Sequence, residues 1–503
     1  MSVPPVRSEQ EDSVEIERTL MIAWAALFIA LAGAAALLIA YSDSFAWHVE
    51  LIDMPARQLA AGGVLSGLAF LALRPLIIHS KKIPPNQQTL LLAIIVAIGL
   101  ALRIAMFWTT PALEDDFYRY LWDGTVTAHG LNPYAITPHE ALFGTTSGPS
   151  VDNLLSKLAS QSPGTMERVN HPHLKTIYPA IAQLAFAAAH LIEPWSLSAW
   201  RFVCLAGEIA TFGLILLLLW HIGRPLLWSA LYWLNPLVIK ELMNSGHMEA
   251  IVLPLVMATL YLAVRQRHLS SATVLALAIG AKLWPAVLIP LVLRPLLPRP
   301  IRLATAIAII AAIVGLCAIP VWLGGINQSS GFVAFATYWQ TNSALFQTLQ
   351  TFAHSLFASS DWSDVASNTP TSNPVPGLVV RAGLAAILVM ATLHLARPPI
   401  TDDRDLMHKA ALSVAALFLL SPAQFPWYAT WIAIFLPFMP LWGLLTLSVT
   451  LPIYYLSFHQ AAHHDYTLFN RWYLWLIWLP IWWLLARDAL SRWRYPLTWS
   501  ADA

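Results

Sequence analysis

The sequence has little charge and little cysteine, and both shortages restrict the class of protein it can encode. Only 11% of its 503 residues are charged, whereas 58% are hydrophobic, which excludes a water-soluble domain of this length. A net charge of +1 provides no basic surface for nucleic acid. The two cysteines, Cys204 and Cys317, lie inside apolar runs. We therefore interpret them as small core residues and not as a disulfide or a metal site.

Two further features are missing. The sequence contains no glycine-rich strand-to-helix loop and no soluble α/β segment, so no nucleotide-binding domain is expected. It also lacks a signal peptide, because residues 1–20 are polar with mixed charge and the apolar run 21–40 is too long for a signal sequence. We interpret that run as an uncleaved first helix.

Apolar runs of about 20 residues recur along the whole chain, and each is long enough to cross about 30 Å of hydrocarbon. The predicted spans are 21–40, 58–78, 88–108, 199–221, 226–243, 248–264, 301–323, 378–396, 408–420, 427–440, 441–457 and 471–487. Segments 176–193 and 270–296 are also apolar but are interrupted by proline or charge, so we expect them to be re-entrant. The predicted fold is an all-α polytopic membrane bundle of about 12–14 segments.

The distribution of arginine and lysine predicts the topology. Basic loops are expected on the cytoplasmic side, and this arrangement leaves loops 109–175 and 324–377 outside, the first of them carrying interfacial helices. The predicted parts are a cytoplasmic tail over 1–20, a transmembrane hairpin over 21–83, the main membrane domain over 84–490 and a cytoplasmic tail over 491–503.

Ionisable and aromatic residues collect in segments that this topology places on the outer face. Asp115, Asp116, Arg119 and Asp123 follow a long apolar helix. Charges at a membrane boundary are costly to desolvate, so their default interpretation is a functional site. Other segments contribute His171, His247, Glu249, Lys282, Trp339, Gln340, Asn342, Trp427, Tyr428 and Arg471. Simpler interpretations exist, because the acids and Arg119 would also suit a structural ion-pair network. An acid at a helix start, such as Glu249, is favoured by the helix dipole alone.

The order of these motifs resembles a known family. The chain reads Asp-Asp-Phe-Tyr-Arg-Tyr-Leu-Trp-Asp-Gly from Asp115, followed by Gly-Leu-Asn-Pro-Tyr, Ile-Tyr-Pro, Asn-Pro-Leu, Gly-His-Met-Glu, Ala-Lys-Leu-Trp-Pro, Trp-Gln-Thr-Asn-Ser and Phe-Pro-Trp-Tyr. This order is similar to that of the GT-C superfamily of polytopic glycosyltransferases. Within the superfamily it most resembles the bacterial polyprenol-phosphate-mannose-dependent mannosyltransferases of glycosyltransferase family 87. The resemblance covers about residues 88–490, and the first two spans look like an N-terminal extension.

The resemblance implies a catalytic base at Asp116 or its neighbour Asp115. Glycosyl transfer from a lipid phosphate needs such a base to take a proton from the acceptor hydroxyl. It also needs cations near the departing phosphate, for which Arg119, Lys282, Lys240 and Arg471 are candidates. Trp339 and Trp427 offer flat faces to a sugar ring or to the first isoprene units. A single displacement with inversion is the simplest mechanism.

The expected substrates are a polyprenyl-phosphate monosaccharide, most simply mannose, and a lipid or glycan acceptor. The expected location is the bacterial inner membrane, among membrane lipids, with the site facing the periplasm. The sequence requires no cofactor, although adjacent acids are also suited to Mg²⁺ or Mn²⁺. Two other classes share the broken helices and intramembrane charge: a transporter, and a flippase or assembly factor for lipid-linked sugars.

Overall fold

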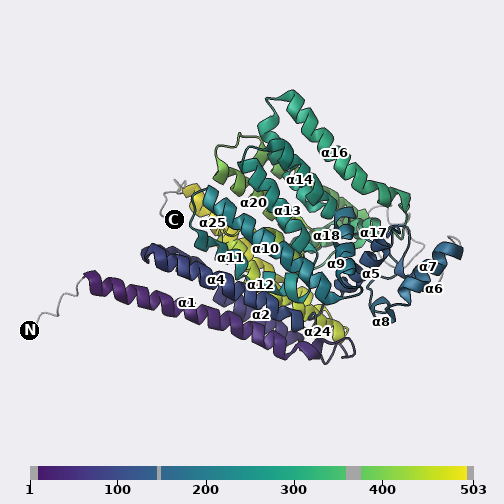
Figure 1. Ribbon diagram of the computed structural model, residues 1–503, viewed down its shortest axis with the longest axis horizontal. Helices are drawn as coiled ribbons and strands as arrows, with labels where there is room; N and C mark the ends of the chain where they lie inside the picture. The colour runs from purple at the N-terminus through teal and green to yellow at the C-terminus, as the bar shows by residue number, and fades with distance from the viewer. Residues whose placement is uncertain (1–8, 144–148, 358–374, 495–503) are drawn as a thin grey trace, which may run out of the picture. The chain divides into compact units, whose positions relative to one another are not determined.

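The computed structural model describes residues 9–143, 149–357 and 375–494, and helices dominate all three stretches (Figure 1). Among these residues the only β-type pairing is an isolated bridge between Thr341 and Ala423. The predicted all-α class is therefore confirmed. Residues 1–8 and 495–503 of the predicted tails, and residues 358–374 of the second predicted outer loop, lie outside the described part of the chain.

The chain divides into two compact units. Unit 1 comprises Met1–Ala112, Leu219–Lys240 and Leu436–Ala503, and unit 2 comprises Leu113–Leu218 and Glu241–Phe435.

Within the described residues, six helices are long and apolar enough to cross a membrane, as a polytopic protein requires. They are Glu17–Ala40, Ala56–Lys82, Pro85–Trp108, Leu197–His221, Pro300–Leu323 and Val375–Ala396. Each of them contains one of the spans predicted from hydropathy.

Unit 1 is built from long N-terminal helices and short helical pieces. Its α-helices are α1 (Glu9–Ala40), α2 (Ala56–Leu71), α3 (Leu73–His79), α4 (Pro85–Ala105), α11 (Ala230–Trp233), α12 (Pro236–Ile239), α22 (Trp442–Leu445), α23 (Leu447–Thr450), α24 (Leu456–Ala462) and α25 (Leu474–Arg494). The buried Arg103 of α4 donates to the Trp233 carbonyl at 2.7 Å, and its guanidinium lies 3.7 Å from the centre of the Trp233 ring. A charge inside an apolar unit is tolerated when it is paired in this way.

Unit 2 contains the remaining helices. They are α5 (Asp116–Ala128), α6 (Pro138–Phe143), α7 (Pro149–Ala159), α8 (Pro163–Met166), α9 (Ala180–Ile192), most of α10 (Leu197–His221), α13 (Glu249–Val264), α14 (His268–Ala281), α15 (Ile289–Leu293), α16 (Pro300–Leu323), α17 (Gly331–Tyr338), α18 (Ala344–Phe357), α19 (Val375–Ala396), α20 (Asp403–Leu420) and α21 (Thr430–Ala433). The helices of unit 2 pack in pairs. Helix α14 packs against α13 and α16, and α5 packs against α9 (Figure 1). A Cβ at Gly124 would lie only 2.4 Å from the Phe186 carbonyl oxygen, so glycine there permits the close approach of α5 and α9.

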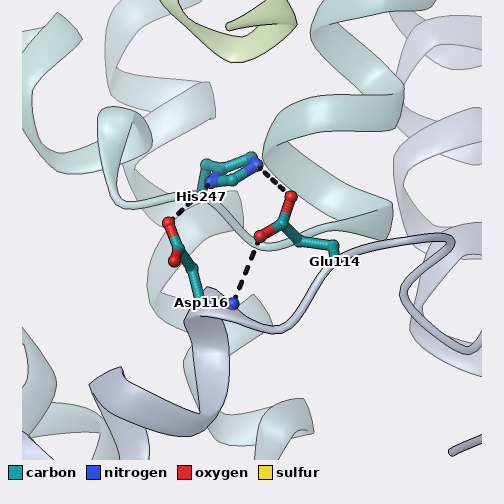
Figure 2. A group of neighbouring side chains, drawn as sticks. All are labelled: Glu114, Asp116 and His247. Carbon is teal, nitrogen blue, oxygen red and sulfur yellow. Dashed lines mark hydrogen bonds and ion pairs between the residues drawn. The ribbon is translucent and has the colours of Figure 1, made fainter. Parts of the chain in front are cut away.

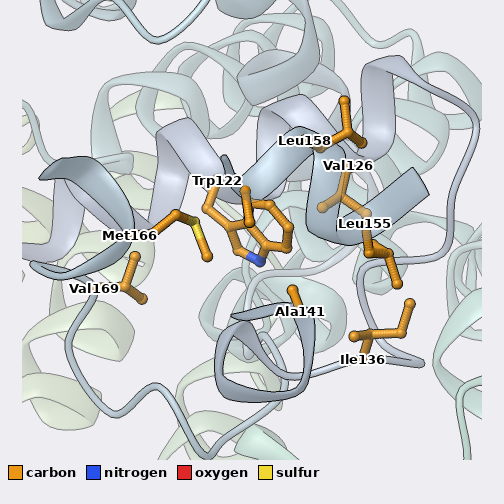
Figure 3. Close-up of a cluster of buried hydrophobic side chains, with 9 residues drawn as sticks. Trp122, Val126, Ile136, Ala141, Leu155, Leu158, Met166 and Val169 are labelled. Carbon is orange, nitrogen blue, oxygen red and sulfur yellow. The ribbon is translucent and has the colours of Figure 1, made fainter. Parts of the chain in front are cut away.

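The first predicted outer loop has a small hydrophobic core of its own (Figure 3). Trp122 and Val126 lie four residues apart on α5 and therefore share one face of that helix. Buried side chains from the segments that follow α5 pack against them: Ile136, Ala141, Leu155, Leu158, Ala159, Met166 and Val169. This cluster holds the short helices α6, α7 and α8 onto α5. The predicted helices within loop 109–175 are thus present.

Several predicted spans are not continuous helices, and proline explains most of the breaks. In 226–243 the chain breaks before Pro236, which has no N–H to donate, and the Asn235 side chain accepts from the Leu237 amide at 3.0 Å to start a new helix. The predicted spans 427–440 and 441–457 are divided into short helical pieces, and Pro426, Pro440 and Pro452 lie in this region. Segment 270–296 was predicted to break, and α14 does end at Ala281, before extended backbone at Lys282.

Candidate active site

An acidic turn precedes α5 in unit 2. The Oε1 atom of Glu114 accepts hydrogen bonds from the backbone amides of Asp115 and Asp116, each at 3.2 Å. These amides belong to the first turn of α5, where backbone donors have no partner within the helix. A carboxylate is also favoured there by the helix dipole. Glu114 therefore fixes the turn that presents the two aspartates.

Asp116 is a supported but accessible carboxylate. Its Oδ1 accepts from Asn170 Nδ2 at 2.8 Å, and its Oδ2 accepts from the Tyr178 hydroxyl at 3.3 Å. The same Asn170 amide donates to Asp115 Oδ1 at 2.9 Å. The Asp116 side chain is 23% exposed, whereas that of Glu114 is 6% exposed. Of these two, Asp116 has more room for a substrate.

His247 approaches this turn from a distant part of the sequence (Figure 2). It follows Gly246, whose φ of +70° is readily adopted only by glycine. Its Nε2 lies 3.0 Å from Glu114 Oε2 and 3.5 Å from Glu241 Oε2, and its Nδ1 lies 4.0 Å from Asp116 Oδ2. The imidazole is thus enclosed by three carboxylates.

The pKa values of Asp115 and His247 are both raised above their usual values. Burial, together with the charges of Glu114 and Asp116, raises the pKa of Asp115 to about 7. Burial alone would lower the pKa of His247, but Glu114 and Glu241 outweigh it and raise that pKa to about 10. His247 is therefore a cation at neutral pH. The cluster has the mixed protonation that acid–base chemistry uses.

Aromatic rings line one side of His247. Its ring stacks on Trp427 with centroids 4.1 Å apart and an interplanar angle of 18°, and Trp427 in turn stacks on Phe425 at 4.2 Å. Tyr428 stacks on Trp431 at 4.3 Å. The predicted Phe-Pro-Trp-Tyr motif thus contacts the histidine of the predicted Gly-His-Met-Glu motif.

Lys282 forms an ion pair with Glu249, whose side chain is fully buried. Its Nζ also lies 4.7 Å from the Tyr428 ring centre and 5.5 Å from that of Trp431. Lys282 was predicted to lie near the departing phosphate. In the structure its anionic partner is Glu249, at the start of α13, and contact with the phosphate stays a prediction. The Lys282 side chain remains 19% exposed.

Helix α10 holds the loop that carries His247. Trp200 Nε1 donates to the Gly246 carbonyl, and the Arg201 guanidinium donates to the Asn244 carbonyl, both at 2.5 Å. The Asn244 residue ends a π-helix, Lys240–Asn244, and single π turns are frequent at functional sites. Trp200 and Arg201 were not among the predicted site residues. An arginine within an apolar span was nevertheless a signal that could have singled out Arg201.

Two other predicted motifs meet each other. The Thr341 amide donates to the Pro422 carbonyl at 3.1 Å, and the Gln424 amide donates to the Thr341 carbonyl at 3.0 Å. Asn342 Nδ2 donates to the Gln424 carbonyl at 3.0 Å, so this buried amide is used in the loop contact. The predicted substrate residues Trp339 and Gln340 lie directly before Thr341. The Gln340 side chain is exposed.

The rings of His171 and Trp339 meet edge to face with centroids 4.7 Å apart. His171 directly follows Asn170, the residue that donates to both aspartates. This contact therefore brings the Trp339 segment next to the acidic turn.

Three predicted substrate residues have other contacts. Arg119 is buried, and its guanidinium donates to the carbonyls of Asn170, His171 and Leu174. Asp123 is buried and accepts from Gln183 at 3.1 Å. These bonds give both residues a structural role in the acidic loop. Arg471 is exposed in unit 1. Direct contact of these three residues with substrate stays a prediction.

Glu114, Asp116 and His247 could hold a metal ion only when His247 is neutral, because an imidazolium has no lone pair for a metal. Each of the three residues offers one ligand atom, and these atoms all lie within 4.8 Å of one another. Two oxygens and one imidazole nitrogen suit Mn²⁺ better than Mg²⁺, which prefers oxygen ligands.

Two family models match the chain. The model described as alpha-(1->6)-mannopyranosyltransferase, N-terminal domain, matches residues 18–297, more than half of the chain. The model of glycosyltransferase family 87 matches residues 176–422. The first match begins at residue 18, inside α1, and so covers both N-terminal membrane helices. The prediction that the first two spans are an N-terminal extension, with the family resemblance beginning near residue 88, is therefore wrong. No curated protein and no solved structure matches the chain.

The helical membrane fold, the carboxylate cluster and these matches define a multipass membrane glycosyltransferase. The chain belongs to the alpha-(1->6)-mannopyranosyltransferase family, with the GT-C-like character of glycosyltransferase family 87. The resemblance inferred from the short motifs is confirmed.

Proposed function

We propose that the protein transfers a mannosyl residue from a polyprenyl-phosphate donor to a hydroxyl of a lipid or glycan acceptor. The observation that carries this proposal is that unit 2 contains both a partly exposed carboxylate, Asp116, and a partly exposed lysine, Lys282. Transfer from a lipid phosphate needs both: a base for the acceptor and a cation for the leaving phosphate.

In the proposed step Asp116 takes the proton of the acceptor hydroxyl. The acceptor oxygen forms a bond to the anomeric carbon while the bond from that carbon to the phosphate oxygen breaks. The electron pair of the broken bond leaves with the polyprenyl phosphate, whose charge Lys282 stabilises. Asn170 and the Tyr178 hydroxyl hold Asp116 in place.

A single displacement inverts the anomeric centre, so a β-linked donor gives an α-linked product. The family description names an alpha-(1->6) linkage, which agrees with this outcome. Both the mannose and the linkage are proposals for this chain. A lipid tail suits an apolar membrane protein, because each buried CH₂ contributes about 0.8 kcal/mol.

The test of the donor uses purified protein in lipid, with labelled mannose supplied either as polyprenyl-phosphate mannose or as the nucleotide sugar. We expect transfer from the lipid-linked sugar alone. Transfer from the nucleotide sugar, with no polyprenyl-phosphate synthase present, would refute the proposal. Transfer only from a lipid-linked sugar other than mannose would keep the mechanism and correct the sugar.

We further propose that the site faces the periplasm of an inner-membrane protein. The motivation is the positive-inside arrangement of the basic loops. Exposed positions in the two predicted outer loops, Ser160 and Asn327, are suited to cysteine labelling, after Cys204 and Cys317 are replaced by alanine. An impermeant reagent should label Ser160→Cys and Asn327→Cys on intact cells. Protection of both positions until the cells are lysed would place the site in the cytoplasm.

A further inference from the structure

Two buried tryptophans beside Lys282 carry donor groups with no use in the mechanism described so far. The Trp284 and Trp431 rings stack with centroids 5.1 Å apart and an interplanar angle of 15°. Trp284 is 7% exposed and Trp431 is 4% exposed. Within the described part of the chain, neither indole Nε1 atom has a hydrogen-bond partner. Buried donors are nearly always satisfied in native proteins, so two unsatisfied ones side by side require an explanation.

Beside these tryptophans lie the Lys282 ammonium, which is a donor, and its partner Glu249, whose Oε2 is a buried acceptor without a hydrogen-bond partner among the described residues. An indole N–H donates and cannot accept, and an ammonium has three donors and no acceptor. Lys282 Nζ lies 5.5 Å from the Trp431 ring centre, so the ammonium and the indoles belong to one cluster. A set that combines positive charge with surplus N–H groups is suited to a ligand with several acceptor atoms and negative charge.

Lys282 alone would attract such a ligand only weakly. Glu249 is fully buried and paired with Lys282, so the two charges cancel in sum. An arriving anion would gain from the ammonium and lose to the nearby carboxylate. Neutral N–H donors would add to the attraction for an anion, because Glu249 does not cancel their effect as it cancels the charge of Lys282.

We propose that Trp284 and Trp431, together with Lys282, form the subsite for the phosphate of the lipid-linked donor, with both indole N–H groups donating to phosphate oxygens. This inference rests on the proposed function, since it deepens the donor site. It makes the two tryptophans binding residues and not only members of an aromatic core.

The test compares polyprenyl phosphate with the neutral polyprenol of equal length as ligands of purified protein in detergent. The variants Trp284→Phe and Trp431→Phe keep an aromatic ring and remove the N–H. Trp322→Phe on α16, where the tryptophan is 73% exposed, is the matched control. A hydrogen bond to a charged group is strong enough that each site variant should bind polyprenyl phosphate about ten-fold more weakly. Their binding of polyprenol should match that of wild type, as should all binding by Trp322→Phe.

Equal binding of polyprenyl phosphate by wild type and both site variants would overturn the subsite while leaving the proposed function intact. Wild type that binds the phosphate no better than the polyprenol would instead refute the donor assignment. Inorganic phosphate that stabilises wild type as well as the lipid does at equal concentration would assign the subsite to free phosphate. If a phenylalanine variant does not fold, 3-benzothienylalanine at that position replaces only the N–H by sulfur, and the same ten-fold loss is expected.

Discussion

The acidic turn before α5 and the break after α14 use opposite arrangements of charge within the same unit. At the turn, Glu114, Asp115 and Asp116 meet one imidazolium, His247, so carboxylates are in excess. At the break, Lys282 and Glu249 cancel each other, and neutral donors and aromatic rings surround them. An excess of carboxylate suits proton acceptance, whereas a neutral pair with surplus donors suits a phosphate. On this difference rests the proposal that the first region activates the acceptor and the second binds the donor.

The largest effect is expected from Asp116→Asn. Asparagine keeps the shape of the side chain but cannot take a proton, and loss of a general base typically costs 10²–10⁴-fold in rate. The measurement is kcat with donor and acceptor at saturation, with Asp465→Asn in an exposed loop as the control. Turnover within a few-fold of wild type would move the base to another carboxylate, with Asp115 the first alternative.

Lys282→Met changes the region at the break after α14 and should mainly lower the affinity for the donor. Removing a charged donor costs roughly 10–100-fold in binding, and methionine is easily accommodated among aromatic rings. Donor KM should rise while acceptor KM stays unchanged, and Lys82→Met serves as the exposed control. Unchanged donor KM would show that the ion pair with Glu249 is only structural.

Gly246→Ala should disturb the position of His247. Alanine in the left-handed region costs roughly 1–2 kcal/mol, and the added Cβ would lie 3.3 Å from the Trp200 ring that anchors this loop. We expect about a ten-fold loss of kcat, which corresponds to about 1.4 kcal/mol in the barrier. Gly325 has a similar φ of +76° and nothing within 4 Å of its Cβ position, so it is the matched control. Gly325→Ala should show comparable strain and normal turnover, and an equal loss of activity in both variants would contradict the positioning role.

The smallest effect is a pH-dependent gain in stability on Asp115→Asn. The raised pKa of Asp115 means that the folded protein keeps a proton which the unfolded chain releases between about pH 4 and 7. Wild type therefore loses stability as pH rises through that interval, and asparagine removes the loss. The variant should have a higher unfolding temperature in detergent at pH 8, with the gap closing towards pH 4. A gap that stays constant with pH would show that Asp115 titrates normally.

The long helices could be predicted from sequence because hydropathy depends on local composition. Each of the six membrane-length helices contains a predicted span, such as α16 over 301–323. Continuity was harder to predict, since the break before Pro236 also depends on the cap that Asn235 provides. The break at Lys282 was predicted because a charge and a proline fall together in one apolar segment.

The site was predictable in its members and less so in its pairings. Asp116, His247 and Lys282 were all selected, because charge is rare in this chain. Their pairing was not predicted, because Glu249 and Lys282, although both selected, are 33 residues apart and meet only through the packing of α13 beside α14. The roles proposed for Trp284 and Trp431 rest on buried N–H groups without a hydrogen-bond partner within the described residues. No local sequence pattern reveals such groups.

The anomeric configuration of the product tests the central claim most directly. Purified protein is given a β-linked polyprenyl-phosphate mannose labelled with carbon-13 at the anomeric carbon, and the one-bond carbon–hydrogen coupling of the isolated product is measured. Direct displacement assisted by a single base predicts an α-linked product, because the anomeric centre inverts once. A β-linked product would require a second displacement and would contradict the assignment of one base at Asp116 and one phosphate subsite at Lys282.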